Sequence, residues 1–568
     1  MADYDLVIRG GTVIDGTGRS SVEADVALTG NRIAAIGKVT GSGAEEIDAK
    51  GKLVTPGFVD IHTHYDAQAV WDDHLAPSSW HGVTTAVMGN CGVGFAPCKP
   101  ADRQKLVELM EGVEDIPGAV MNEGLKWEWE SFGEYLNALE RKSRDIDICA
   151  LLPHAAVRVY VMGERALQLE NANQADIAQM REIARDAMKA GAFGFSTSRS
   201  LSHKTLKGDP TPTLRVQEEE LRGLALGMKD AGSGMLEMVS EWAPDHNAEF
   251  AMLRRVVEAC GRPAVFTLTQ RHARPEVWRD MLANADKAIA DGLSIRPVFG
   301  PRAVGVLLGL SGSQNPFSGC PSYKAIADLP LAERVRQMRD PAVRAAILSE
   351  DPKKESTFPL MHRLSYAFMF RFGNPPNYEP KMEDSLEAIA AREGRTPPEV
   401  AYDVLLESDG TDFIYTTLSS YAYGDLSMAE TLLKTPNAIM GLGDGGAHVA
   451  FILDAGYQTW LLTHWGRERG MFKTEELIRR LTSDTAGAAG LHDRGVLAIG
   501  KKADVNVIDW DRLGADKPYV AHDLPAGGKR LLQKVYGYEA TIVSGQVTFR
   551  EGVPTGVLPG RLVRGPQA

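Results

Sequence analysis

Two histidines stand one residue apart at the end of an apolar segment of the chain. His62 and His64 lie in VDIHTHYD, which follows KLVTPGF, a run that reads as strand and turn. On a strand, residues i and i+2 point to the same face, so both imidazoles would project side by side from one strand end. Such a pair suits a metal ion, although two polar residues in a surface turn give the same pattern. The other strand ends must decide between these interpretations.

A cysteine and an aspartate occupy similar positions farther along the chain. Cys91 lies in the glycine-flanked turn GNCG after the apolar run TTAVM, and Asp444 lies in the turn GLGDGG. A thiolate is a strong ligand for zinc-like ions, and a carboxylate can hold a metal and accept a proton from water. Alone, Cys91 could be a small buried hydrophobe and Asp444 a turn former. With His62 and His64, they predict a site for zinc or a similar divalent metal, one or two ions, in which Asp444 is also the catalytic residue.

The elements that would position these four residues alternate in type. From about residue 53, short apolar runs alternate with helical patterns about eight times, which is the signature of a parallel (β/α) barrel. Active residues of such barrels lie at the carboxyl ends of the strands, where these four fall. Both chain ends instead contain short alternating segments broken by Gly-Gly, Gly-Asn and Lys-Gly, which are typical of β-hairpins. We therefore predict an α/β fold, a TIM-like (β/α)8 barrel with a small β-sandwich satellite domain formed by both chain ends.

The predicted domain boundaries follow these changes of pattern. We expect residues 1–55 and 486–568 to form the satellite domain and residues 56–485 to form the barrel. The stretch at about 301–434 is helical and charged and interrupts the alternation of strands and helices. We interpret it as an insertion at the mouth of the barrel.

Composition limits the partners and the compartment. The formal net charge of −13 argues against nucleic acid and against an anionic membrane surface as partners. No run of about 18 apolar residues is present to span a bilayer, and the first residues lack the pattern of a signal peptide. The five cysteines are unevenly spaced, which is typical of a reduced chain. We expect a cytoplasmic protein that acts on a small molecule, and a homo-oligomer is compatible with the sequence.

Several motifs resemble a known superfamily. PGFVDIHTHYD, GNCG, GDGG and ADVNVIDW resemble the amidohydrolase superfamily, and HGVTTAVMGNCGVGFAPC is similar to its N-acyl-D-amino-acid deacylase (D-aminoacylase) branch. The resemblance implies a TIM-like barrel with a β satellite and a metal-dependent hydrolase of a C–N bond. The bond would be the amide of an N-acyl amino acid or of a related small amide, attacked by a metal-activated water. His62, His64, Cys91 and Asp444 match the functional positions of that family.

Two strand ends depart from the family pattern. Where the family has a histidine at the end of strand five, this chain has Glu237 in LEMVSE, and FTLTQRH places no histidine in register at strand six. Glu237 could ligate a metal, carry a proton or bind a cationic substrate group, and we favour the last two roles.

The sequence also predicts substrate-binding residues and leaves other functions open. The residues expected to contact substrate are His154, Arg271, Arg296 and His448. Two alternatives stay open: a one-metal enzyme of the same fold that acts on a lactone or as a lyase, and a catalytically inactive amidohydrolase-like protein.

Overall fold

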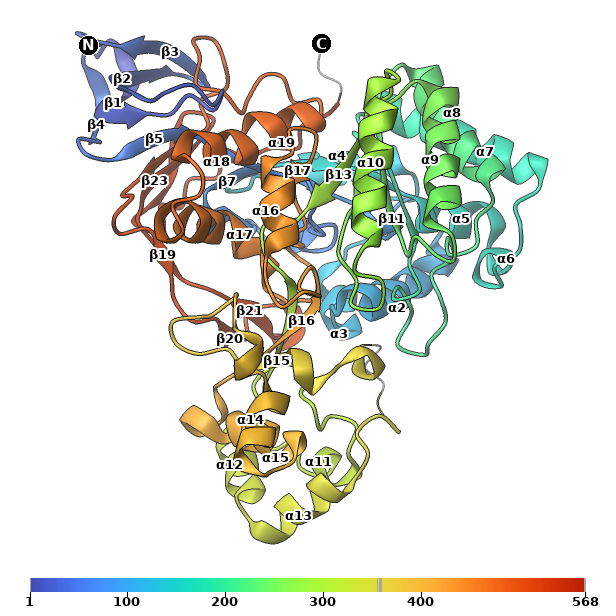
Figure 1. The fold of residues 1–568 in the computed structure, drawn as a ribbon. Coiled ribbons are helices and arrows are strands. Elements are labelled where there is room, and N and C mark those ends of the chain that lie inside the picture. Colours follow the sequence, from blue (N-terminus) through green and yellow to red (C-terminus); the bar gives the residue numbers. More distant parts are fainter. Residues whose placement is uncertain (1, 355, 357–359, 566–568) are drawn as a thin grey trace.

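The computed structural model describes residues 2–354, 356 and 360–565 and has an α/β architecture (Figure 1). The predicted α/β class is confirmed. The described strands form separate hydrogen-bonded sheets, in two of which every pairing is parallel. None of the described helices is both long enough and apolar enough to cross a membrane.

The two parallel sheets form the centre of the molecule. One has the order β6-β7-β8 and the other the order β17-β13-β12-β11-β10-β9. Their bounds are Phe58–Asp60 (β6), Val83–Met88 (β7), Asp147–Ala150 (β8), Leu152–Pro153 (β9), Gly194–Arg199 (β10), Met235–Ser240 (β11), Ala264–Thr267 (β12), Ile295–Phe299 (β13) and Ile439–Met440 (β17). Every residue of β7 is buried, as expected for a parallel strand that is covered on both faces.

Amphipathic helices connect these strands or follow the last of them. They include α7 (Gln174–Ala190), α8 (Glu218–Ala231), α9 (His246–Cys260), α10 (Val277–Ala290), α16 (Ser427–Lys434) and α18 (Thr474–Leu481). Figure 1 shows α7 to α10 side by side along one flank of the molecule. Asn173 caps α7 by accepting hydrogen bonds from the backbone N–H groups of Ala175 and Asp176, and Gly191 ends it at a φ of 111°.

Strands from both chain ends share one nine-stranded sheet. Its order is β25-β24-β23-β18-β5-β1-β2-β3, with β4 beside β1. The bounds are Tyr4–Val13 (β1), Val22–Thr29 (β2), Arg32–Gly37 (β3), Gly43–Asp48 (β4), Leu53–Pro56 (β5), Val505–Ile508 (β18), Tyr538–Val543 (β23), Gln546–Arg550 (β24) and Val553–Pro554 (β25). Val54 of β5 lies opposite Val507 of β18. The two ends of the chain therefore meet in one sheet.

Between β13 and β17 the chain forms a lobe with a hydrophobic core of its own. The lobe contains α11 (Pro321–Lys324), α12 (Leu331–Met338), α13 (Pro341–Ser349), α14 (Leu386–Glu393), α15 (Pro397–Leu406) and an antiparallel sheet of β14 (Val304–Leu308), β15 (Met369–Arg371) and β16 (Ile414–Ser419). Figure 1 shows the lobe's helices projecting away from the parallel sheets, with β15 and β16 between.

Backbone hydrogen bonds join the segments that follow β6 and β17, the outermost strands of the two parallel sheets. The N–H of Asp444 donates to the carbonyl of His62 at 3.2 Å, and the N–H of His64 donates to the carbonyl of Gly445 at 2.7 Å. Thr63 and Gly445 also form an isolated parallel bridge. These contacts bring predicted site residues from the first and last strands together.

Candidate metal centre and pocket

Three of the predicted ligands converge after two neighbouring strands. His62 and His64 follow β6, and Cys91 follows β7. One ligand atom from each of the three lies within 4.8 Å of the others, and all three residues are buried. Cys91 Sγ lies 3.5 Å from His62 Nε2, and the two imidazole centroids are 5.4 Å apart. Two imidazole nitrogens and a thiol are a donor set that zinc takes.

A tight glycine turn places Cys91 in this cluster. Cys91 has a φ of 57°, a left-handed conformation that is uncommon for a residue with a side chain. Gly89 has a φ of 84°, and a Cβ there would come within 2.4 Å of the carbonyl oxygen of Leu151. Asp66 supports the turn because its Oδ2 accepts a hydrogen bond from the N–H of Gly89 at 2.9 Å.

Asp444 lies beside the two histidines. Its Oδ1 is 3.4 Å from His62 Nε2 and 3.6 Å from His64 Nε2. Burial alone would raise the pKa of the Asp444 carboxyl, but the hydrogen bond and charge of the histidines outweigh burial and hold this pKa below its usual range. Asp444 is therefore an ionised carboxylate at neutral pH.

The two histidines differ in their electrostatic surroundings. Burial lowers the pKa of His62 to about 4. Burial also acts to lower the pKa of His64, but the charges of Glu114 and Asp444 outweigh it and raise this pKa to about 9. The acids around His64 therefore favour positive charge at that position, whether on a proton or on a metal ion.

Glu237, on β11, faces the same cluster. Its Oε2 accepts a hydrogen bond from the N–H of Cys91 at 3.0 Å, and its Oε1 lies 4.0 Å from His62 Nδ1. Oε1 is buried and has no hydrogen-bond partner among the described residues. Burial raises the pKa of Glu237 to about 8, so its carboxyl group can hold a proton near neutral pH.

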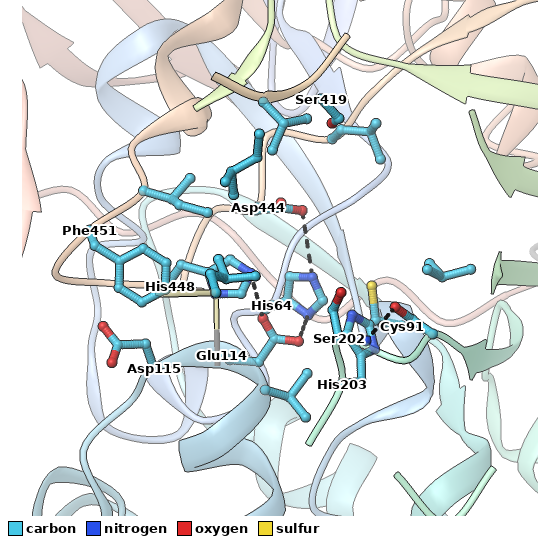
Figure 2. Close-up of a pocket in the computed structure, with 18 of the residues that line it drawn as sticks. His64, Cys91, Glu114, Asp115, Ser202, His203, Ser419, Asp444, His448 and Phe451 are labelled. Atoms are coloured by element: carbon cyan, nitrogen blue, oxygen red, sulfur yellow. Dashed lines mark hydrogen bonds and ion pairs between the residues drawn. The ribbon is translucent and has the colours of Figure 1, made fainter. Parts of the chain in front are cut away.

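Glu114, the last residue of α2 (Arg103–Glu114), also lies at the site and was not predicted from the sequence. Its side chain is 1% exposed and contacts His64 Nδ1 at 3.4 Å and His448 Nε2 at 3.5 Å (Figure 2). A single glutamate at the end of a helix carries no spacing signal that could have identified it. Its role depends on how α2 packs against the loop after β17.

A cavity of about 220 Å³ opens beside these residues. His62, His64, Cys91, Asp444 and His448 line it, and Figure 2 shows several of them pointing into it. The apolar residues of the lining include Val239, Val304, Leu360, Leu418, Phe451 and Ile452. Three of these, Val304, Leu360 and Leu418, come from the lobe between β13 and β17.

Two arginines line the same cavity. Arg271, a predicted substrate-binding residue, forms an ion pair with Glu241. Arg363, in the lobe, donates a hydrogen bond to Ser202 Oγ at 2.6 Å and has no ion-pair partner among the residues described. Arg363 was not predicted as a site residue. Unlike Arg271, it has no acidic partner among the described residues to balance its charge.

The structure does not bring two other predicted substrate-binding residues to this cavity. His154 follows β9 but is fully buried, with hydrogen bonds to Thr197 Oγ1 and Glu220 Oε1 at 2.9 Å each. Arg296 is the second residue of β13, so it lies at the amino end of that strand and lines a separate cavity with His492. We had expected Arg296 near the carboxyl end, because the residue pattern of LSIRPVF does not show where in this run the strand lies.

Comparisons with known proteins find a matching family model and related enzymes. Residues 45–549 match the model of the family described as "Amidohydrolase family". D-aminoacylase of Alcaligenes xylosoxydans xylosoxydans is 26% identical over 99% of this chain and 97% of its own length. N-acyl-D-glutamate deacylase of the same organism is 27% identical over 99% and 96%.

A solved structure shows the same fold. N-acyl-D-glutamate deacylase from Bordetella bronchiseptica, complexed with zinc and a phosphonate inhibitor, has a TM-score of 0.67 at 23% identity and covers 99% of this chain and 100% of its own. The predicted resemblance to N-acyl-D-amino-acid deacylases is confirmed. Because the family model spans most of the sequence, this chain belongs to the amidohydrolase family.

Proposed function

We propose that this protein is a metal-dependent hydrolase that cleaves the amide C–N bond of N-acyl amino acids. The observation that carries the proposal is the convergence of His62, His64 and Cys91 within 4.8 Å, with Asp444 Oδ1 in contact with both imidazoles. The similarity to D-aminoacylase and to N-acyl-D-glutamate deacylase supports the substrate class. The zinc in the related solved structure supports zinc as the metal.

The residues present fit a divalent metal. Among the described residues, Glu237 Oε1 is a buried polar atom beside the cluster without a hydrogen-bond partner, which supports a bound group there that protein contacts do not supply. We assign His62, His64, Cys91 and Asp444 as the ligands of one ion. Glu237 can be a further ligand of this ion or an acid next to it. When bound, the ion supplies Lewis-acid chemistry: it lowers the pKa of a water molecule and polarises the amide carbonyl.

The chain's own residues move the protons. An oxygen of the Asp444 carboxylate accepts a proton from the attacking water, because Asp444 is ionised at neutral pH and borders the cavity. The same carboxyl group then donates this proton to the leaving nitrogen. Glu237 with its raised pKa is a second acid that can hold a proton near the acyl carbon.

The cavity lining supports an anionic and partly apolar substrate. We assign the carboxylate of the amino acid to Arg363, since the charge of Arg271 is already matched by Glu241. The apolar wall that includes Val304, Leu418 and Phe451 would receive the acyl group or the amino-acid side chain. Both assignments require the lobe between β13 and β17 to form one side of the substrate site.

Elemental analysis combined with hydrolysis in 18O-labelled water tests the proposal. We expect about one zinc or similar ion per chain and one labelled oxygen in the released carboxylate, because hydrolysis must add solvent oxygen. The double substitution His62→Ala/His64→Ala should remove most of the metal. A folded double variant with full metal content would contradict the ligand assignment, and cleavage without label would indicate a lyase.

We also infer a closed barrel, a satellite domain and a cytoplasmic location. The bridge between Thr63 and Gly445 supports closure of the parallel sheets between β6 and β17. The nine-stranded sheet supports residues 1–55 and 486–568 as one domain, with 56–485 as the barrel and 301–434 as its insertion. All five cysteines are buried and unpaired, which supports a reducing compartment.

A further inference from the structure

Glu114 is a buried carboxylate beside the metal ligands. It takes no part in the proton transfers proposed for Asp444 and Glu237. It lies between two imidazoles, with Oε1 at 3.4 Å from His64 Nδ1 and Oε2 at 3.5 Å from His448 Nε2. Figure 2 shows the two contacts as dashed lines that meet at this side chain. One carboxylate therefore contacts a residue of the segment after β6 and a residue of the loop after β17.

The backbone strengthens the link between α2 and the loop after β17. The N–H of His448 donates a hydrogen bond to the carbonyl of Glu114, so main chain and side chain of the same two residues meet. His448 has a φ of 46°, and Asp115, the residue after Glu114, has a φ of 52°. Both segments therefore turn sharply where they meet.

The position of Glu114 relative to His64 has a chemical consequence. A carboxylate next to one nitrogen of an imidazole keeps the ring proton there and leaves the other nitrogen free to bind a metal. Glu114 faces His64 Nδ1, whereas His64 Nε2 faces Asp444. His64 Nδ1 and Glu114 Oε2 have no hydrogen-bond partner among the described residues, so nothing else described there orients that edge of the ring.

We propose that Glu114 is a positioning residue that orients the His64 ring with Nε2 toward the metal and fastens the His448 turn beside it. The proposal rests on the metal site of the proposed function. It assigns Glu114 no contact with the substrate or with the reacting atoms. Loss of the Glu114 carboxylate would therefore change the affinity for the metal and the link between His64 and His448.

Zinc affinity, measured by competition with a chromophoric chelator, tests this role. Glu114→Gln keeps the size of the side chain but removes its charge, and it should weaken zinc binding by about 10- to 100-fold. Glu114→Asp, which keeps the charge but shortens the reach, should give a smaller loss. Glu108→Gln is the matched control, because Glu108 lies on the same helix and contacts Lys207 instead. Its zinc affinity should equal that of the wild type.

A double-substitution cycle separates positioning from a general loss of structure. His448→Gln should weaken zinc binding severalfold in the wild type and add little in Glu114→Gln, because both changes break the same link. If Glu114→Gln does not fold, the zinc affinities of Glu114→Asp and His448→Gln test the positioning role instead. Unchanged zinc affinity in these variants overturns the inference and leaves the proposed function intact. Absence of zinc binding by the wild type overturns both.

Discussion

Arg363→Met should reduce the preference of the enzyme for substrates that carry a carboxylate. A unit charge pair at about 4 Å interacts with about 4 kcal/mol at an effective dielectric constant of 20. Arg363 is exposed at the cavity, so solvent screens much of this energy. A hydrogen bond to a charged group contributes about 1.5–3 kcal/mol, which corresponds to about a 10- to 150-fold loss in kcat/KM. The loss should appear mainly in KM if the contact is equally strong in the ground state and in the transition state.

The assay compares an N-acyl amino acid with its carboxamide, which differs only in lacking the negative charge. Release of the free amine gives kcat/KM for both substrates in the wild type and in the variant. The carboxamide rate should not change in Arg363→Met. Arg371→Met is the control, because Arg371 also lies in the lobe but pairs with Glu407. An equal ratio of the two rates in the wild type and in Arg363→Met would refute the assignment of the carboxylate to Arg363.

Three further substitutions test other parts of the reasoning. Asp444→Asn should keep the fold but reduce kcat by orders of magnitude, since the proton acceptor is lost, and near-normal turnover would remove Asp444 from the mechanism. Glu237→Gln should keep the metal content, measured by elemental analysis, and lose activity; loss of both would instead indicate that Glu237 is a ligand. Asp147→Asn should lower the free energy of unfolding in urea by about 1.5–3 kcal/mol, because Arg494 and Lys502 each lose a buried charged partner and keep only Asp493 and Asp504. Burial acts to raise the pKa of Asp147, but Lys502 and Arg494 outweigh it and lower this pKa, so the stabilisation is present above about pH 4 and is lost as pH falls through the folded-state pKa. An unfolding free energy with the same pH dependence below pH 4 in the wild type and in Asp147→Asn would contradict this account.

The strand ends that carry the predicted site were readable from the sequence because they combine a buried apolar run with a local turn. His62 and His64 follow β6, and Cys91 follows β7 in a tight turn in which Gly89 and Gly92 also have positive φ angles. The same reasoning gave the wrong end of a strand for Arg296. Polar and apolar residues do not alternate throughout the run LSIRPVF, so its pattern does not show where in the run the strand lies, and β13 spans Ile295–Phe299.

The rest of the site depends on contacts between segments that are distant in the sequence. Arg363 and Ser202 meet because the lobe between β13 and β17 approaches the loop after β10, and neither segment has a periodic pattern that encodes this contact.

Glu237 shows how local pattern and distant contacts combine in one residue. The sequence predicted Glu237 at the end of a strand, whereas the structure places it third among the six residues of β11, and three roles stayed open. Its Oε2 accepts a hydrogen bond from the N–H of Cys91, so one oxygen is engaged in holding the cysteine turn. The other oxygen, Oε1, lies 4.0 Å from His62 Nδ1 and has no hydrogen-bond partner among the described residues. A carboxylate with one engaged oxygen and a pKa of about 8 is better suited to hold a proton than to act as a second full ligand. Since the cavity lining at strand six offers Thr267 and Thr269 rather than histidine, a second ion would have few ligands there, and we favour a single metal with Glu237 as its neighbouring acid.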